Sequence, residues 1–190
     1  MAGGTVDWQQ ALTFLFRNSE LCTLGSAMAA ADGSISVEQS LMFFTYSAAD
    51  RLLLFTSYEE PVGKMGNIRA SPNVAVLINS FEGRSATNAL LAGQEPHAMT
   101  VYGKASVIPP GATDEQRFRD IQSAAHPSFA GAFQGKGSMV IAVSVDSILV
   151  VTVKGVSVRI KDPLTVWQAS QPAISGSTAS SYQSTAVSRL

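Results

Sequence analysis

The chain has 190 residues, a length that suits one domain with a single core. Its 13 basic and 14 acidic side chains leave a formal net charge of −1, so we expect no nucleic-acid partner. Cys22 is the only cysteine, which excludes an internal disulfide framework, and with only two histidines the chain is poorly supplied with metal ligands.

The longest apolar tract, from Met139 to Val153, is interrupted by Ser144 and Asp146. It falls short of the roughly 20 residues that cross a bilayer. The first residues carry no basic region ahead of an apolar stretch, as a secretory leader would. We therefore expect a soluble intracellular protein with no membrane partner.

Residues 6–18 are expected to form an amphipathic helix, because their apolar side chains recur near helical spacing. From Leu21 onwards, short aliphatic and aromatic runs between turn signals predict strands, and Asp32-Gly33 predicts a hairpin turn. The expected strands are Leu21–Ala29, Ser40–Ser47, Leu52–Ser57, Val74–Asn79, Met99–Ile108, Met139–Val145 and Ile148–Lys154.

Two helices are expected among these strands. The first covers Lys64–Ala70 and ends before Pro72, because the residue that precedes a proline disfavours the helical conformation. The second covers Thr113–Ala125, with Phe118 and Ile121 on one face. Many short strands and few helices favour a mainly β fold, an antiparallel β-barrel with peripheral helices, over a doubly wound sheet.

The domain organisation follows from a change in composition near residue 163. We expect the barrel domain to cover residues 1–162 and a flexible tail to cover residues 163–190. The tail is rich in serine and threonine and has Arg189 as its single charged side chain.

Four motifs occur in a characteristic order: LLLFTS, then Gly63-Lys64, then NIRASPNVAVLIN, then TVYGKASVI. This order resembles the FMN-binding split β-barrel of the pyridoxamine 5′-phosphate oxidase superfamily, over about residues 11–160. The stretch LLAGQEPHAMTVYGKASVI is similar to a fungal and protist branch of uncharacterised homologues. The resemblance implies an antiparallel split β-barrel of the FMN-binding type.

The resemblance also implies a set of residues around the cofactor. Thr56 and Ser57 lie where the family offers hydroxyls to the FMN phosphate, and Lys64 lies where a lysine neutralises it, a donor set that suits a phosphate. The strand after Ser40 would present its main chain to the isoalloxazine ring. The implied cofactor-binding residues are Leu41, Met42, Phe43, Phe55, Thr56, Ser57 and Lys64. The alternative for Lys64 is an ordinary solvated loop lysine, and for the hydroxyls ordinary turn bonding.

A homodimer is the expected assembly, because in this family the flavin lies in a groove between two barrels. We expect three aromatic residues to be exposed along the groove strands and to support this assembly: Phe43, Phe44 and Phe55.

The chain also departs from the oxidase pattern. The strand from Ser40 to Thr45 lacks the two flanking cations of the oxidase, and His97-Ala98 replaces an arginine–glutamine pair. On the substrate-binding helix, Gln122, His126 and Ala130 replace tyrosine, arginine and serine, so we do not expect vitamin B6 oxidase activity. Arg69 and Arg84 are the cations that could compensate near the flavin.

The function expected from the resemblance is that of an FMN-dependent oxidoreductase acting on a small-molecule substrate that the sequence does not identify. The flavin would carry the redox chemistry, so no catalytic side chain is assigned. The alternative is a flavin-binding or haem-binding module on the same barrel, without turnover and with a stress-response role.

Ser188-Arg189-Leu190 resembles the Ser-Lys-Leu peroxisomal signal. It predicts capture by the peroxisomal import receptor and location in a peroxisome or a related organelle. The alternative is an ordinary polar tail on a cytoplasmic protein.

Overall fold

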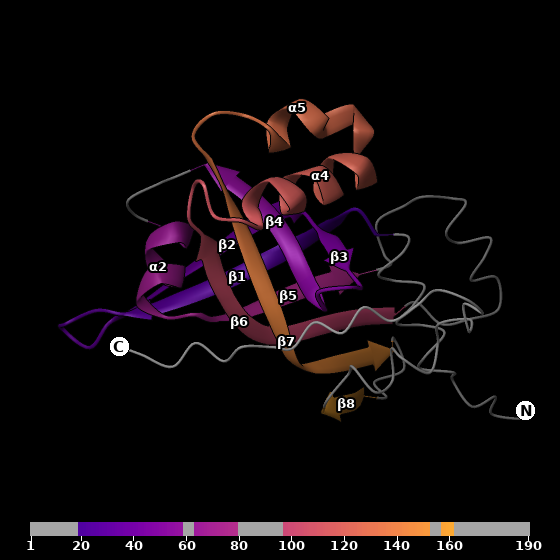
Figure 1. Cartoon of the computed structure of the whole chain (residues 1–190). Coiled ribbons are helices and arrows are strands. Elements are labelled where there is room, and N and C mark those ends of the chain that lie inside the picture. The colour runs from indigo at the N-terminus through magenta and orange to yellow at the C-terminus, as the bar shows by residue number, and fades with distance from the viewer. Residues whose placement is uncertain (1–18, 59–62, 80–96, 153–156, 162–190) are drawn as a thin grey trace, which may run out of the picture.

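The computed structural model describes residues 19–58, 63–79, 97–152 and 157–161 (Figure 1). Its eight strands are β1 (Leu21–Ala29), β2 (Ile35–Phe43), β3 (Thr45–Ser47), β4 (Leu52–Tyr58), β5 (Asn73–Asn79), β6 (His97–Ile108), β7 (Ser138–Thr152) and β8 (Ser157–Lys161). The helices are α2 (Lys64–Ala70), α4 (Glu115–Ala125), the 3₁₀ turn η1 (Pro127–Phe129) and α5 (Ala130–Phe133).

Several expectations lie outside the described residues. These are the helix over residues 6–18, the tail over residues 163–190 with its C-terminal tripeptide, and Arg84. They stay predictions.

The strands form one antiparallel sheet in the order β2-β1-β5-β6-β7-β4-β3, with β8 paired to β7. The strands at the two ends of this order, β2 and β3, are separated in the chain by Phe44 alone. Because one residue cannot bridge a wide gap, the two edges of the sheet must curl towards each other. The mainly β antiparallel barrel expected from the sequence is confirmed, with its opening where β2 meets β4.

The barrel is filled from one face of each strand, and β4 shows how the two faces differ. Leu53 and Phe55 are fully buried in the main core, whereas Leu54 is fully buried in a smaller cluster with Phe118 of α4. A strand that is covered on both faces has a continuous apolar sequence, and the sequence Leu-Leu-Leu-Phe at the start of β4 is of this kind.

Inside the main core, burial raises the pKa of the Cys22 thiol to about 12, so this thiol is unsuited to act as a nucleophile.

The hairpin between β1 and β2 forms at Asp32-Gly33, as expected. Gly33 adopts a φ of 83°, and Asp32 Oδ1 accepts a hydrogen bond from the main-chain N–H of Ser34 at 2.9 Å. The expected start of the next strand at Ser40 was wrong, because this turn returns the chain directly into β2 at Ile35. The polar residues between Ile35 and Ser40 did not indicate a strand in the sequence. They are tolerated in β2 because it is an edge strand with one solvated face.

The two strands expected over 139–145 and 148–154 are one continuous strand, β7. The polar residues around Asp146, which suggested a turn, instead mark an irregularity in the pairing with β6. Tyr102 pairs with Ser147 and Gly103 pairs with Val145, so Asp146 is the extra residue of a β-bulge. Strand β8, which pairs with the second half of β7, was not expected.

Helices α4 and α5 lie together over β4 and the start of β7, whereas α2 lies apart from them against β1 and β6 (Figure 1). Helix α2 has the bounds expected from the sequence. Helix α4 begins at Glu115, two residues later than expected, and buries Phe118 as expected. Within the described residues, no helix is long and apolar enough to cross a membrane.

Candidate functional site

A hollow of about 540 Å³ opens where the ends of β2 and β4 meet the start of α2 and the turn of α5. Its volume falls within the range of ligand pockets, roughly 300–1,000 Å³. The lining residues are Leu21, Leu41, Met42, Phe43, Thr56, Ser57, Tyr58, Lys64, Ala132, Phe133 and Ser138.

The structure brings six of the seven predicted cofactor residues together around this hollow: Leu41, Met42, Phe43, Thr56, Ser57 and Lys64. The seventh, Phe55, lies one residue before Thr56 but is fully buried in the core. The expectation of exposed groove aromatics was wrong for both Phe55 and Phe44, which is 2 % exposed. Only Phe43 of that trio reaches the hollow, because Phe44 and Phe55 face the barrel interior.

One side of the hollow is polar. Lys64 stands at the first residue of α2, where its Nζ donates a long hydrogen bond of 3.5 Å to Ser40 Oγ. Ser57 Oγ donates to its neighbour's main-chain oxygen, Tyr58 O, at 3.3 Å. Both hydrogen bonds are long and therefore weak, so these donors can turn to a ligand at little cost.

The main chain of β2 forms another polar part of the hollow. This strand lies at the edge of the sheet and pairs with β1 alone, with Leu41 opposite Thr23 and Phe43 opposite Leu21. In an antiparallel pair, alternate residues direct their N–H and C=O groups away from the partner strand. Main-chain groups along residues 41–43 are therefore available to a planar ligand with a polar edge, as an edge strand of this kind allows.

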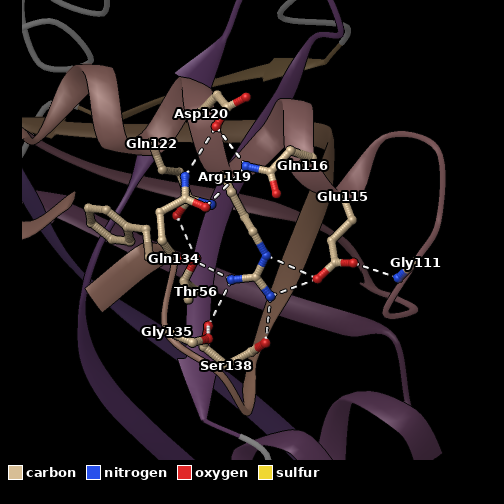
Figure 2. Close-up of polar contacts among 11 residues, drawn as sticks. Thr56, Gly111, Glu115, Gln116, Arg119, Asp120, Gln122, Gln134, Gly135 and Ser138 are labelled. Atoms are coloured by element: carbon tan, nitrogen blue, oxygen red, sulfur yellow. Dashed lines mark hydrogen bonds and ion pairs between the residues drawn. The ribbon is translucent and has the colours of Figure 1, made fainter. Parts of the chain in front are cut away.

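Behind the hollow lies a buried arginine that the sequence analysis did not single out (Figure 2). Arg119 of α4 donates to the main-chain oxygen of Phe133, to both Oγ and O of Ser138 (2.8 and 2.6 Å), and to Glu115 Oε1 at 2.7 Å. Phe133 and Ser138 line the hollow, so Arg119 fixes part of its wall. The same hydrogen bonds from Arg119 hold the pKa of Glu115 below its usual value. The sequence signal for a buried Arg119 was its position on α4, next to Phe118 and one turn before Gln122, both of which are buried.

Gln122, His126 and Ala130 stand where the oxidase family has its substrate-binding tyrosine, arginine and serine. Gln122 is 1 % exposed and His126 is 7 % exposed, while Ala130 begins α5. His126 Nε2 donates to the main-chain oxygen of Phe44 at 2.9 Å, and its ring lies 5.3 Å from that of Phe43. His126 does not line the hollow. In the described part of the chain, no cluster of three or more potential metal ligands occurs.

A second, larger hollow of about 610 Å³ lies at the other end of α2. Among the described residues that line it, Arg69 is the charged one, beside Pro72, Pro109 and Pro110. Arg69 therefore faces a different hollow from Lys64, which removes it as the cation expected to compensate near a flavin.

Comparison with known proteins finds solved structures that are similar to this one, but no similar sequence. No protein-family profile matches the chain, and no curated protein sequence matches it. An FAD-binding protein from Mesorhizobium loti superposes with a TM-score of 0.53 at 18 % identity, covering 79 % of this chain and 97 % of that one. A protein of the pyridoxinephosphate oxidase family from Clostridium acetobutylicum, related to general stress protein 26, gives a TM-score of 0.54 at 4 % identity, covering 82 % and 94 %.

The chain has the split β-barrel fold of the pyridoxamine 5′-phosphate oxidase-like proteins. A heme-binding protein from Mycobacterium smegmatis has the same fold, with a TM-score of 0.61 at 12 % identity over 88 % of this chain and 62 % of that one. The structural relatives of this split barrel thus include flavin-binding and haem-binding proteins.

Proposed function

We propose that the chain binds FMN in the hollow between β2, β4 and α2, and that it is an FMN-dependent oxidoreductase. The observation that carries this proposal is that the lining of one hollow includes a cation and two hydroxyls, those of Lys64, Thr56 and Ser57. A phosphate needs such a set of charged and neutral donors. Aromatic and aliphatic side chains form the remaining walls, as an isoalloxazine ring needs.

The residues present fit FMN, with different residues for its phosphate, for the polar edge of its ring and for the faces of its ring. Lys64, Thr56 and Ser57 would hold the phosphate, while the edge main chain of β2 would hydrogen-bond the polar edge of the ring. Phe43 and Phe133 would exclude water from the ring faces. When bound, the flavin supplies hydride or electron transfer, which no side chain of the hollow provides.

Haem fits the same hollow less well. A haem site usually supplies an axial side-chain ligand such as histidine, cysteine, methionine or tyrosine. His126 does not line the hollow, and its Nε2 is already engaged with Phe44 O. Cys22 is buried in the core. Tyr58 and Met42 line the hollow, but its lining within the described part of the chain includes no arginine to bind a propionate, so the flavin is the better match.

The test is a titration of the purified protein with FMN, riboflavin and hemin, followed by flavin fluorescence and by absorbance. We expect FMN to bind and to be favoured over riboflavin, which lacks the phosphate. Addition of NADH or NADPH then separates an oxidoreductase, which bleaches the bound flavin, from a carrier. A protein that binds hemin and ignores FMN would overturn the proposal.

We also propose that the protein is a homodimer formed through the outer face of β2. On this face of the strand, three of four successive side chains are apolar and exposed, with Gln39 between the second and the third: Ile35 (70 % exposed), Val37 (64 %) and Leu41 (65 %). Leu41 also lines the hollow, so this apolar face is continuous with the candidate site. A second copy on this face would cover apolar surface and one side of the hollow together.

A further inference from the structure

The side-chain amide of Gln122 is buried behind the hollow, and its nitrogen makes no hydrogen bond to the described residues. It is 1 % exposed, and its Oε1 accepts the hydroxyl hydrogen of Thr56 at 3.1 Å, as Figure 2 shows. Its Nε2 has no hydrogen-bond partner within the described part of the chain. An unpaired buried N–H group destabilises a fold, so packing alone does not account for a glutamine at this position.

The amide can turn by 180° without changing the shape of the side chain, because its oxygen and nitrogen are nearly equal in size. After this turn, Nε2 takes the place of Oε1 beside Thr56 Oγ1 and donates to it. The unused atom is then a carbonyl oxygen, and buried carbonyls with spare acceptor capacity are commoner than buried N–H groups without partners. Both orientations keep one hydrogen bond to Thr56.

The two orientations give Thr56 opposite properties in the hollow, which its side chain helps to line. When Gln122 accepts, the Thr56 hydrogen is occupied and only oxygen lone pairs face a ligand. When Gln122 donates, the Thr56 hydrogen is free for the ligand. Since an anion accepts hydrogen bonds and cannot donate them when fully ionised, only the second arrangement suits a phosphate.

We propose that Gln122 is a positioning residue that makes Thr56 a hydrogen-bond donor and thereby sets the preference of the hollow for phosphorylated over dephosphorylated flavin. The proposal rests on the proposed function, because it takes the anion to be the phosphate of FMN. Gln122 acts through Thr56 and does not itself line the hollow.

The test measures the ratio of FMN to riboflavin affinity in a double-mutant cycle of Gln122→Met and Thr56→Val. Each single change should weaken FMN binding by about fivefold, because T56V removes the hydroxyl and Q122M removes the amide that orients it, and each should leave riboflavin binding unchanged. The double variant should bind FMN no more weakly than T56V, because both changes remove the same contact. The folding stability of Q122M should change little, since the variant removes one hydrogen bond to Thr56 together with a buried polar atom that has no partner.

The control is Gln116→Met, since Gln116 lies on the exposed face of α4 and hydrogen-bonds Asp120 and Gln134 there. Q116M should leave both affinities unchanged. Gln122→Leu replaces Q122M if the latter does not fold. Equal losses for FMN and riboflavin in Q122M, or additive losses in the cycle, would overturn the positioning role while leaving FMN binding intact. A wild-type protein that binds neither flavin would overturn the proposed function, and this role with it.

Discussion

Gly103 of β6 lies so close to Ser144 of β7 that a β-carbon on Gly103 would stand 2.1 Å from the Ser144 carbonyl oxygen. The contact is next to the β-bulge at Asp146, where the two strands change register. The glycine of the motif Val101-Tyr102-Gly103 thus has a physical reason in this fold: only a residue without a side chain lets the two main chains approach at the bulge.

Gly103→Ala should therefore destabilise the barrel, by about 1–3 kcal/mol or more, because the clash is with main chain and forces one strand to move. The measurement is the urea midpoint followed by circular dichroism. Gly131→Ala is the matched control, since a β-carbon on Gly131 in α5 would meet nothing within 4 Å. Equal midpoints for G103A and wild type would contradict the close approach.

Arg119→Met should lower the folding stability by about 1–3 kcal/mol or more, since it leaves buried hydrogen-bond acceptors without a donor. The change leaves Glu115 and the main-chain oxygens of Phe133 and Ser138 without their donor. Arg117→Met is the control on the same helix, because the Arg117 side chain is 44 % exposed and its ion pair with Asp50 is worth about 0.2–1 kcal/mol. Chemical unfolding of both variants compares the two positions, and similar losses would refute the buried role of Arg119.

Asp50 should give the folding stability a dependence on acidic pH. The hydrogen bonds from the Arg117 guanidinium, and then the Ser47 hydroxyl, hold the pKa of Asp50 below its ordinary value of 3.8. A folded-state pKa below the unfolded one stabilises the protein above the unfolded value, and this contribution is lost as the pH falls through the lowered pKa.

The stability difference between wild type and Asp50→Asn should consequently be constant from about pH 7 to pH 5 and shrink below about pH 4. Urea unfolding at a series of pH values measures it. A difference that does not change with pH would show that Asp50 is not linked to folding in this way.

Lys64→Ala should weaken FMN binding by about tenfold or more, since a hydrogen bond to a charged group is worth roughly 1.5–3 kcal/mol. Riboflavin binding should not change, because riboflavin has no phosphate for Lys64 to pair with. Fluorescence titration measures both affinities. Lys104→Ala serves as a control at an exposed position outside the hollow. Equal loss in K64A and K104A would mark Lys64 as an ordinary surface lysine.

Val37→Glu should convert the proposed dimer into a monomer, because it places a charge in the middle of the apolar face of β2. Sedimentation velocity at micromolar concentration measures the assembly state. Asp146→Asn, which also changes a charge but lies in the bulge of β7, should not alter it. A wild-type protein that sediments as a monomer at all concentrations would contradict the dimer.

Much of the candidate site could be predicted because the order of motifs along the chain resembles that of a known family, and the resemblance implies which residues surround the cofactor. Thr56 and Ser57 lie near the end of a strand and Lys64 begins a helix, so the local sequence also predicts the elements that carry them. The distinction between Phe43 and Phe44 could not be predicted in the same way, because adjacent residues of a strand take opposite faces and the break between β2 and β3 falls at Phe44.

The sequence by itself determined the strand-rich antiparallel class, the hairpin at Asp32-Gly33 and the limits of α2, since propensity, turn chemistry and proline act locally. Only the tertiary structure decided that β7 runs unbroken past Asp146, because a bulge needs the partner strand to define it. Only the tertiary structure also placed Arg119 and Gln122 behind the hollow, since burial of a polar side chain depends on the partners that packing brings to it.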